Sequence, residues 1–299
     1  MKSLSTDQRT LREIVEAYSH RQVTLRRRLT GWYRVLPDFV IVGAQKCGTS
    51  SLYAYVLQHP CVLPALRKEI HFFGTSKYYT AGINWYRAHF ATSWQKQWLG
   101  RRYGHTLLTG EASPSYMFRP HAPRQLRVTI PRAKLIVLLR NPVDRAYSHY
   151  QHMVRAGVET LSFEEAIERE PERIKGEMER MIADARYTSS VVTRHGYLAK
   201  GLYVDQMKRL CASFPREQIL VVRSEDLQSS PNATVDTVSA FLDLPPHPLS
   251  TYRHFQVGTY PAMSTVMRNR LLDYFAPHNK QLCEYLGINM GWDEEAHNA

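Results

Sequence analysis

A continuous apolar run that ends in a glycine-bounded turn places the strongest constraint on the fold of this chain. The run DFVIVGA (38–44) leads into a short segment between Gly43 and Gly48, and a helical pattern, SSLYAYVLQHP, follows and stops at Pro60. An apolar run of this kind is typical of a strand that is buried on both faces of a parallel sheet. The segment therefore predicts a strand–turn–helix unit of an α/β protein.

Two further apolar runs repeat the alternation of strand and helix. AKLIVLLRNP (133–142) precedes the helical pattern VDRAYSHYQHMVRAG, and EQILVVRSEDL (217–227) precedes ATVDTVSAFLDL. Strands that alternate with helices predict a three-layer α/β fold around a central parallel sheet. The charged segment 163–187 has a helical pattern, and we expect it to be an excursion over that sheet.

Length and composition favour one main domain. With 299 residues, 43% of them hydrophobic, the chain can bury one sizeable α/β core. We expect residues 36–299 to form this domain and residues 1–35 to add a basic helical extension. The sequence contains no run of 18 apolar residues, which a membrane span needs, and no apolar segment typical of a secretory signal. Because its four cysteines are scattered, we expect a cytoplasmic protein without a structural metal site.

The formal net charge of +12 favours anionic partners. The cluster RQVTLRRRLTGWYR (21–34) could contact phosphates or a membrane, or it could be a solvated helix face. Because no nucleic-acid motif is found elsewhere, we expect no nucleic-acid partner. The sequence leaves the oligomeric state open.

The turn between Gly43 and Gly48 fits an anion-binding loop better than an ATP site. Glycines and a helix N-terminus can direct backbone N–H groups at a phosphate. A Walker loop has lysine directly after its second glycine, but this chain has Thr49 there and Lys46 inside the loop. The strand predicted within AKLIVLLRNP ends in Arg140, where a Walker-B strand would end in an acidic metal ligand. A P-loop kinase or NTPase is therefore the weaker alternative, and a purely steric turn also remains possible.

Arg140 and Ser148 form a second candidate anion site. Arg140 follows a strand directly, where open α/β sheets bind ligands, and Ser148 lies about two helical turns further on. An arginine and a hydroxyl can together hold a phosphate. Arg140 could instead pair with Asp144. Two anion sites at one sheet edge would suit a ligand that carries phosphate at two places.

Several segments resemble those of one enzyme family. GAQKCGTSSL resembles the 5′-phosphosulfate loop of sulfotransferases, and LLRNPVDRAYSHY resembles their 3′-phosphate segment. The resemblance continues in order through KEIHFFG, GEASPSY, GLYVDQMKRLCASFPREQILVVRSEDL and YPAMS. KEIHFF is most similar to the heparan-sulfate-type branch (N- and 3-O-sulfotransferases) and its bacterial relatives.

The resemblance implies a P-loop-like sulfotransferase fold and a reaction without metal. The donor would be 3′-phosphoadenosine 5′-phosphosulfate (PAPS), the product 3′-phosphoadenosine 5′-phosphate (PAP), and the acceptor a hydroxyl or amine. A non-catalytic binder of phosphonucleotides or anionic glycans is the remaining alternative.

The resemblance also assigns roles to individual residues. Glu69 would be the general base, His71 the second choice for that role, and Lys46 would stabilise charge on the leaving phosphate. Lys68 and Glu111 would contact the acceptor, although Lys68 could simply pair with Glu69 and Glu111 with a nearby cation. The donor would contact Gln45, Lys46, Cys47, Gly48, Thr49, Ser50, Ser51, Arg140, Ser148, Tyr197 and Tyr260, with core packing as the alternative for Tyr197.

The acceptor is not fixed by these motifs. Glycosaminoglycan-acting members tend to have lysine after the glutamate of GEASPSY, whereas this chain has Ala112. We expect a small-molecule, lipid-like or carbohydrate acceptor, with a preference for the first two. The choice would be made by residues 74–105 and 160–195. The first of these loops is rich in aromatic residues that could line a pocket or belong to the core, namely Tyr78, Tyr79, Trp85, Tyr86 and Trp94.

Overall fold

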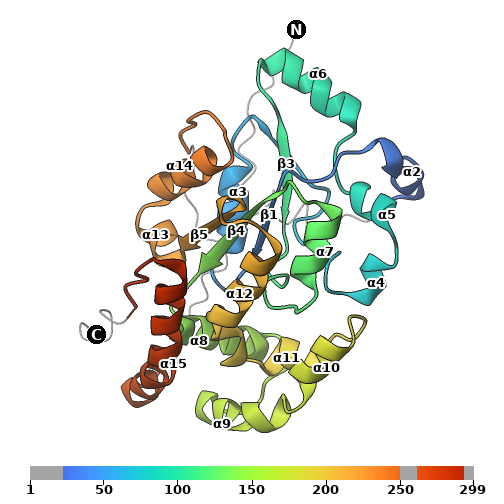
Figure 1. The fold of residues 1–299 in the computed structure, drawn as a ribbon. Coiled ribbons are helices and arrows are strands. Elements are labelled where there is room, and N and C mark those ends of the chain that lie inside the picture. The colour runs from blue at the N-terminus through green and yellow to red at the C-terminus, as the bar shows by residue number, and fades with distance from the viewer. Residues whose placement is uncertain (1–22, 250–260, 293–299) are drawn as a thin grey trace.

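A five-stranded parallel sheet forms the centre of the molecule (Figure 1). The computed structural model describes residues 23–249 and 261–292. The strands lie in the order β2-β3-β1-β4-β5. Their bounds are β1 Phe39–Gly43, β2 Val62–Pro64, β3 Leu108–Ala112, β4 Lys134–Leu139 and β5 Ile219–Arg223. The three strands predicted from apolar runs are confirmed as β1, β4 and β5, whereas β2 and β3 were not expected. β2 has only 3 residues, and β3, with the sequence LTGEA, contains no apolar run.

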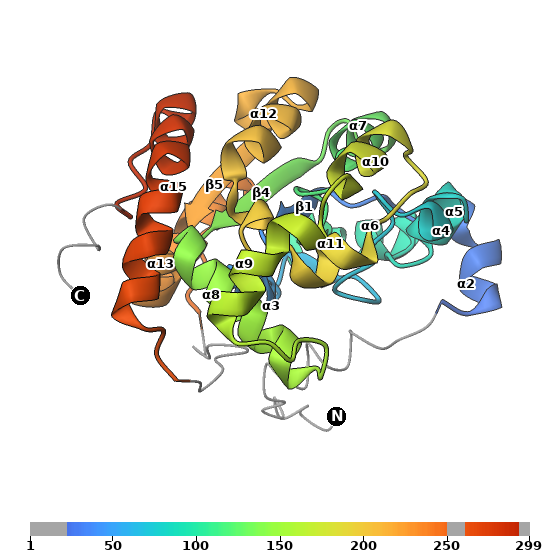
Figure 2. The ribbon, with the colours of Figure 1, turned by 90° about the horizontal axis from the view of Figure 1, so that it is seen from below.

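Helices cover both faces of the sheet, which confirms the three-layer α/β fold class. Figure 2 shows α3 (Thr49–Val56) on one face and α7 (Ala122–Thr129) and α12 (Tyr203–Ser213) on the other. The remaining helices are α2 Leu25–Leu29, α4 Ser76–Tyr79, α5 Ile83–Arg87, α6 Ser93–Tyr103, α8 Pro142–Arg155, α9 Phe163–Arg173, α10 Glu177–Ala183, α11 Ser190–His195, α13 Ser224–Ser229, α14 Pro231–Phe241 and α15 Thr265–Leu286, with 3₁₀ turns η1 Gly31–Tyr33, η2 Ala199–Gly201 and η3 Arg216–Gln218.

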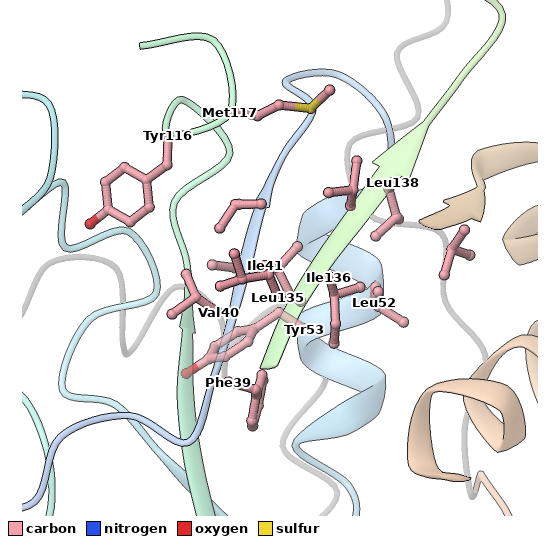
Figure 3. Close-up of a cluster of buried hydrophobic side chains, with 14 of the residues drawn as sticks. Phe39, Val40, Ile41, Leu52, Tyr53, Tyr116, Met117, Leu135, Ile136 and Leu138 are labelled. Carbon is pink, nitrogen blue, oxygen red and sulfur yellow. The ribbon is translucent and has the colours of Figure 1, made fainter. Parts of the chain in front are cut away.

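The core between β1, β4 and α3 fixes the position of the first turn of α3 (Figure 3). Every residue of β1 is buried, as expected for a central strand with neighbours on both sides. Leu52 and Tyr53 of α3 pack against this layer, and the Tyr53 hydroxyl donates to the carbonyl of Gly110 at 3.0 Å. Because α3 is held on the sheet in this way, its N-terminus and the loop before it stay at the carboxyl end of β1.

The charged segment 163–187 forms helices, as predicted, but they do not lie over a face of the sheet. It is divided into α9 and α10 at Gly176, whose φ of 73° is in the left-handed region that glycine tolerates. Together with α11, these helices lie beyond the carboxyl ends of the strands (Figures 1 and 2). The segment therefore borders the edge at which ligands of open α/β sheets bind.

Some expectations fall outside the described residues or stay untested. Of the basic extension at residues 1–35, the structure describes residues from 23 onward, where α2 and η1 are found; Tyr260 lies outside the described residues. The boundary at residue 35 remains a prediction. Among the residues that are described, no helix combines the length and apolarity needed to cross a bilayer. The same residues contain no group of three His, Cys, Asp or Glu side chains placed to hold a metal ion.

Candidate active site

The loop between β1 and α3 presents backbone donors at the carboxyl edge of the sheet. Lys46 has φ 69° and Gly48 has φ 87°, so both adopt the left-handed conformation. This conformation is uncommon for a residue with a side chain, and such strain is concentrated at functional sites. Within the described residues, the amides of Lys46, Cys47 and Gly48 make no hydrogen bond. The loop therefore has the unpaired N–H groups that an anion-binding turn requires.

Positive charge is crowded around Lys46. Burial and the nearby charges of Arg155, Arg140 and Arg145 lower the pKa of Lys46 to about 8. The guanidinium of Arg140 lies 3.5 Å from the carbonyl oxygen of Lys46. In the described part of the chain, neither Lys46 nor Arg140 forms an ion pair with a carboxylate. An anion bound here would relieve the repulsion among these cations.

The alternative ion pair between Arg140 and Asp144 does not form. Asp144 pairs instead with Arg268 of α15, which lies 124 positions later in the sequence. The guanidinium of Arg140 is thus left beside the loop, where it could contact a phosphate.

One face of α8 continues the cationic surface. Ser148, His152 and Arg155 lie four and then three residues apart, so they share one side of the helix. Ser148 is largely buried, and its contact with a 3′-phosphate remains a prediction. Below this face, among the described residues, buried nitrogens of Arg145 (Nε and Nη1) and His149 (Nδ1) have no hydrogen-bond partner. Burial and the charges of Lys200, Arg145 and Lys46 hold the pKa of His149 well below its ordinary value.

Glu69 and His71, the two candidates for the general base, are in direct contact. The Oε2 atom of Glu69 lies 3.2 Å from Nε2 of His71. The other oxygen, Oε1, accepts a hydrogen bond from Nζ of Lys68 at 2.8 Å. Lys68 Nζ also donates to Oγ of Ser50, in the first turn of α3, at 2.6 Å. Lys68 therefore connects the candidate base to the anion-binding loop.

The charge state of Glu69 follows from these contacts. Burial favours its neutral form, but the hydrogen bond with His71 and the charge of Lys68 outweigh burial and lower the pKa of Glu69 to about 2. The carboxylate is consequently ionised at neutral pH and can accept a proton. His71 itself has φ 56°, so the second candidate also occupies a left-handed backbone position.

Glu111 does not reach the acceptor pocket, which corrects the expectation that it contacts substrate. Its carboxylate is fully buried, and burial raises its pKa although four donors oppose that effect. One oxygen accepts from Tyr86 at 2.7 Å and Tyr116 at 3.1 Å. The other accepts from Ser113 Oγ at 2.6 Å and the amide of Ile70 at 3.2 Å. Glu111 thus fixes the turn in which Glu69 and His71 lie.

The side chains of Tyr197 and Cys47, two residues expected to contact the donor, are buried and cannot reach it. Tyr197 is fully buried and donates its hydroxyl to Glu159 at 2.9 Å, so its ring belongs to the core and is not open for stacking on adenine. Cys47 is fully buried too, and burial raises its pKa to about 11. Its backbone, as part of the loop, can still face an anion. The Thr49 and Ser51 side chains are nearly buried.

A pocket of about 310 Å³ opens beside Glu69 and His71. The lining includes residues of both loops expected to choose the acceptor, and its members are Gln45, Glu69, His71, Thr75, Tyr78, Ser115, Phe118, Arg119, Met181, Val192, Thr193 and Lys200. Of the five aromatic residues singled out in the sequence, Tyr78 lines this pocket, Tyr86 is buried and Trp94 is exposed. The wall is thus partly apolar, with the candidate base at one side.

Lys200 is a pocket residue that the sequence did not single out. Its ammonium donates to Gln45 Oε1 at 3.0 Å and to the carbonyl of Thr193 at 2.7 Å. Burial and the charges of Arg145 and Arg119 hold the pKa of Lys200 well below its ordinary value. The signal that could have found it is its position between Tyr197, an expected donor contact, and GLYVDQMKRL, the start of a segment that belongs to the family resemblance.

Comparisons with known proteins identify the family of this chain. The family model "Sulfotransferase domain" matches residues 36–269, which is more than half of the chain. A sulfotransferase from Alicyclobacillus acidocaldarius has a similar structure, with a TM-score of 0.64 and 33% sequence identity over 86% of this chain and 99% of that one.

Two further relatives are similar at lower identity. "Bifunctional heparan sulfate N-deacetylase/N-sulfotransferase 1" of Caenorhabditis elegans is 28% identical over 280 residues, which is 85% of this chain and 30% of that protein. "Membrane-associated sulfotransferase kil1" of Dictyostelium discoideum is 27% identical over 325 residues, which is 86% of this chain and 66% of that protein. The chain therefore spans less than a third of the C. elegans relative.

The buried Glu111 network predicts a large loss of stability on truncation. Glu111→Ala would remove the acceptor of three buried hydroxyls, those of Tyr86, Tyr116 and Ser113, so we expect a loss of about 3–5 kcal/mol in the free energy of unfolding. Glu111→Gln keeps the shape and should cost about 1–3 kcal/mol. Urea unfolding measures both.

Glu172→Ala provides the control for this series. Glu172 is exposed and its ion pair with Arg169 spans 3.8 Å, so its removal should change stability by less than about 0.5 kcal/mol. If Glu111→Ala cost no more than Glu172→Ala, the network could not be what holds the turn.

Proposed function

Since the chain belongs to the sulfotransferase domain family and is an enzyme of that class, we propose that it transfers a sulfuryl group from PAPS to a hydroxyl or amine, with Glu69 as general base. One observation carries the proposal. A single side chain, Lys68, bonds both to Ser50 of the anion-binding loop and to the carboxylate of Glu69. A donor on the loop and an acceptor beside Glu69 would therefore be adjacent.

The residues of the loop fit a donor with several negative charges. The unpaired amides of the loop and the crowded cations Lys46 and Arg140 are suited to phosphosulfate, and Arg140 with Ser148 is suited to a second phosphate. PAPS, when bound, supplies an activated sulfuryl group whose leaving group is a phosphate. Lys46 would stabilise the charge that grows on that leaving group. A requirement for metal is not part of this proposal.

Glu69 would act as base in an environment that already keeps it ionised. Its low pKa makes it a weak base at rest, because Lys68 and His71 stabilise its charge. If Lys68 turned from Glu69 toward developing negative charge near Ser50, the carboxylate would become more basic when a proton must be accepted. His71 would then orient Glu69 through the Nε2 contact. The two candidates named from the sequence thus work best as a pair.

The pocket supports a compact acceptor that is partly apolar. Phe118, Met181 and Val192 provide apolar wall, while Arg119 provides positive charge and Lys200 an amino group. We propose a small-molecule or lipid-like alcohol or amine as the preferred acceptor. A carbohydrate acceptor is the second candidate, because the C. elegans relative is named for heparan sulfate N-sulfotransferase activity. Action in the cytoplasm remains a proposal that is based on four scattered cysteines, all of them free thiols.

Replacing the base tests the proposal directly. Glu69→Gln should lower turnover by at least about 10²-fold while leaving PAP affinity within about twofold, because the amide cannot accept the proton. His71→Asn should cost less, since His71 only orients the carboxylate. Transfer of label from [³⁵S]PAPS to an acceptor found by screening alcohols, phenols and amines would measure turnover, and calorimetry would measure PAP affinity.

The opposite ranking would assign the base to the histidine. If Glu69→Gln kept near-native turnover and His71→Asn abolished it, the base would be His71. The pH profile separates the two as well. With Glu69 as base, a pKa of about 2 predicts no loss of rate from this group between pH 8 and 5. A rate that fell across this range would contradict Glu69 as the base.

The lowered pKa of Lys46 predicts that donor affinity depends on pH. Only the charged ammonium attracts phosphosulfate, and this charge is lost as the pH rises through about 8. PAP should therefore bind roughly tenfold more weakly at pH 9 than at pH 7. Lys46→Arg retains its charge throughout this range and should show a nearly flat profile. Wild-type affinity that did not change, or an equal change in Lys46→Arg, would exclude Lys46 as the titrating group.

A further inference from the structure

The three exposed tryptophans of the chain lie on two elements, η1 and α6, that are hydrogen-bonded to each other. Trp32 and Trp94 are 70% and 69% exposed and Trp98 is 47% exposed, whereas the other two, Trp85 and Trp292, are half-buried and buried. We call this surface the Trp face. It is built from α2, η1 and α6, and its members are Leu25, Arg26, Arg28, Leu29, Trp32, Trp94, Trp98, Arg101 and Arg102.

Hydrogen bonds on the inner side hold α2 and η1 so that their apolar residues face outward. Arg27 donates to the carbonyls of Ala88 at 2.6 Å and Phe90 at 3.1 Å. Arg34 also donates to the carbonyl of Phe90, at 2.8 Å. With Arg27 directed inward, Leu25 and Leu29 are left 70% and 69% exposed. The hydrogen bonds of Arg27 and Arg34 therefore fix the orientation in which these apolar side chains are exposed.

The two halves of the Trp face are joined where η1 meets α6. Ser93 Oγ donates to the carbonyl of Tyr33 at 3.0 Å. Trp32 precedes Tyr33 and Trp94 follows Ser93, so both tryptophans are next in sequence to a residue of this hydrogen bond. Trp94 and Trp98 stack with ring centroids 6.2 Å apart. The guanidinium of Arg102 lies 5.6 Å from the centre of the Trp98 ring. Spacings of four residues place these three side chains on one side of α6.

Charge on the Trp face has a single sign. Segments 23–37 and 85–107 each contain four Lys or Arg residues and no Asp or Glu. One of these cations, Lys96, pairs with Asp38 at 2.7 Å. Arg26, Arg28, Arg101 and Arg102 are exposed beside the tryptophans. The surface is therefore suited to a partner that is anionic and also accepts apolar side chains.

We propose that the Trp face binds the surface of a lipid bilayer that contains anionic headgroups. Tryptophans enter the interfacial layer of a bilayer, leucines reach the acyl boundary, and arginines meet the lipid phosphates. A second copy of the chain would set cations against cations. A nucleic acid or an anionic glycan would match the charge but would leave Leu25 and Leu29 without an apolar partner.

The position of the Trp face leaves the pocket accessible. Because Lys96 of α6 pairs with Asp38, directly before β1, α6 lies at the amino-terminal edge of the sheet. The candidate active site lies at the opposite, carboxyl edge, and Figure 1 shows α6 and α11 at opposite ends of the molecule. Membrane binding through this face would thus be separable from donor binding and catalysis.

Vesicle binding tests the proposal. In sedimentation assays, the protein should bind vesicles of phosphatidylcholine with about 30% phosphatidylserine, and bind pure phosphatidylcholine at least about tenfold more weakly. Raising the salt from about 0.1 to 0.5 M should weaken binding, and the tryptophan emission should shift to shorter wavelength on binding. Trp94→Ala/Trp98→Ala and, separately, Arg101→Glu/Arg102→Glu should each reduce affinity at least about tenfold.

A matched control has the same change of charge elsewhere. Lys208→Glu/Lys280→Glu alters exposed residues of α12 and α15 and should bind vesicles like the wild type. PAP affinity should be unchanged in all three double variants, which also shows that they fold. Several results would overturn the proposal: no binding to anionic vesicles, an equal loss in the control, or binding to RNA or heparin but not to vesicles.

Discussion

The buried carboxylate of Glu111 is the contact on which the candidate active site depends. A buried carboxylate is costly unless its oxygens are satisfied, and each oxygen of Glu111 accepts two hydrogen bonds. Ser113, one of its donors, also accepts from the amides of Ile70 and His71 at 3.1 Å each. β3 thereby holds the turn with Glu69 and His71 beside the carboxyl end of β1. The position of the general base is set by buried contacts and not by the pocket itself.

The anion-binding loop has the opposite electrostatic character. Around Lys46 the cations outnumber their partners, and buried nitrogens of Arg145 remain unpaired within the described residues. Such an arrangement lowers stability in the absence of ligand and is relieved when an anion binds. Lys68 connects the two regions, since it contacts Ser50 and Glu69 at once. The hydrogen bonds around Glu111 are all made within the protein, whereas the cations around Lys46 are suited to an anionic donor.

The sequence predicted those strands that are marked by an apolar run of neighbouring residues. Apolar runs predicted β1, β4 and β5, and the order of motifs predicted the fold and the family. β3 was missed because its sequence, LTGEA, has three consecutive residues, Thr, Gly and Glu, that interrupt any apolar run. Glu111 of β3 was expected to contact substrate, because the sequence does not distinguish a buried glutamate from an exposed one.

Contacts between distant segments could not be read from the sequence. Gln45 and Lys200 meet in the pocket although 155 residues separate them. Asp144 could have paired with Arg140, a near neighbour, but Arg268 reaches it from α15. Tyr197 resembled a stacking residue, yet Glu159 holds its hydroxyl in the core. For Asp144 and Tyr197 the tertiary structure chose between interpretations that the sequence left open.

Binding of PAP, compared with ATP and magnesium, tests the central claim most directly and needs no acceptor. A ligand at 100 times its dissociation constant stabilises the folded state by about 2.7 kcal/mol, so thermal unfolding can detect it. The account predicts a clear rise in the unfolding temperature with PAP, little with ATP and magnesium, and a much smaller rise with PAP in Lys46→Ala. A rise with ATP and magnesium alone would contradict the account and would identify the loop as a site for nucleoside triphosphate.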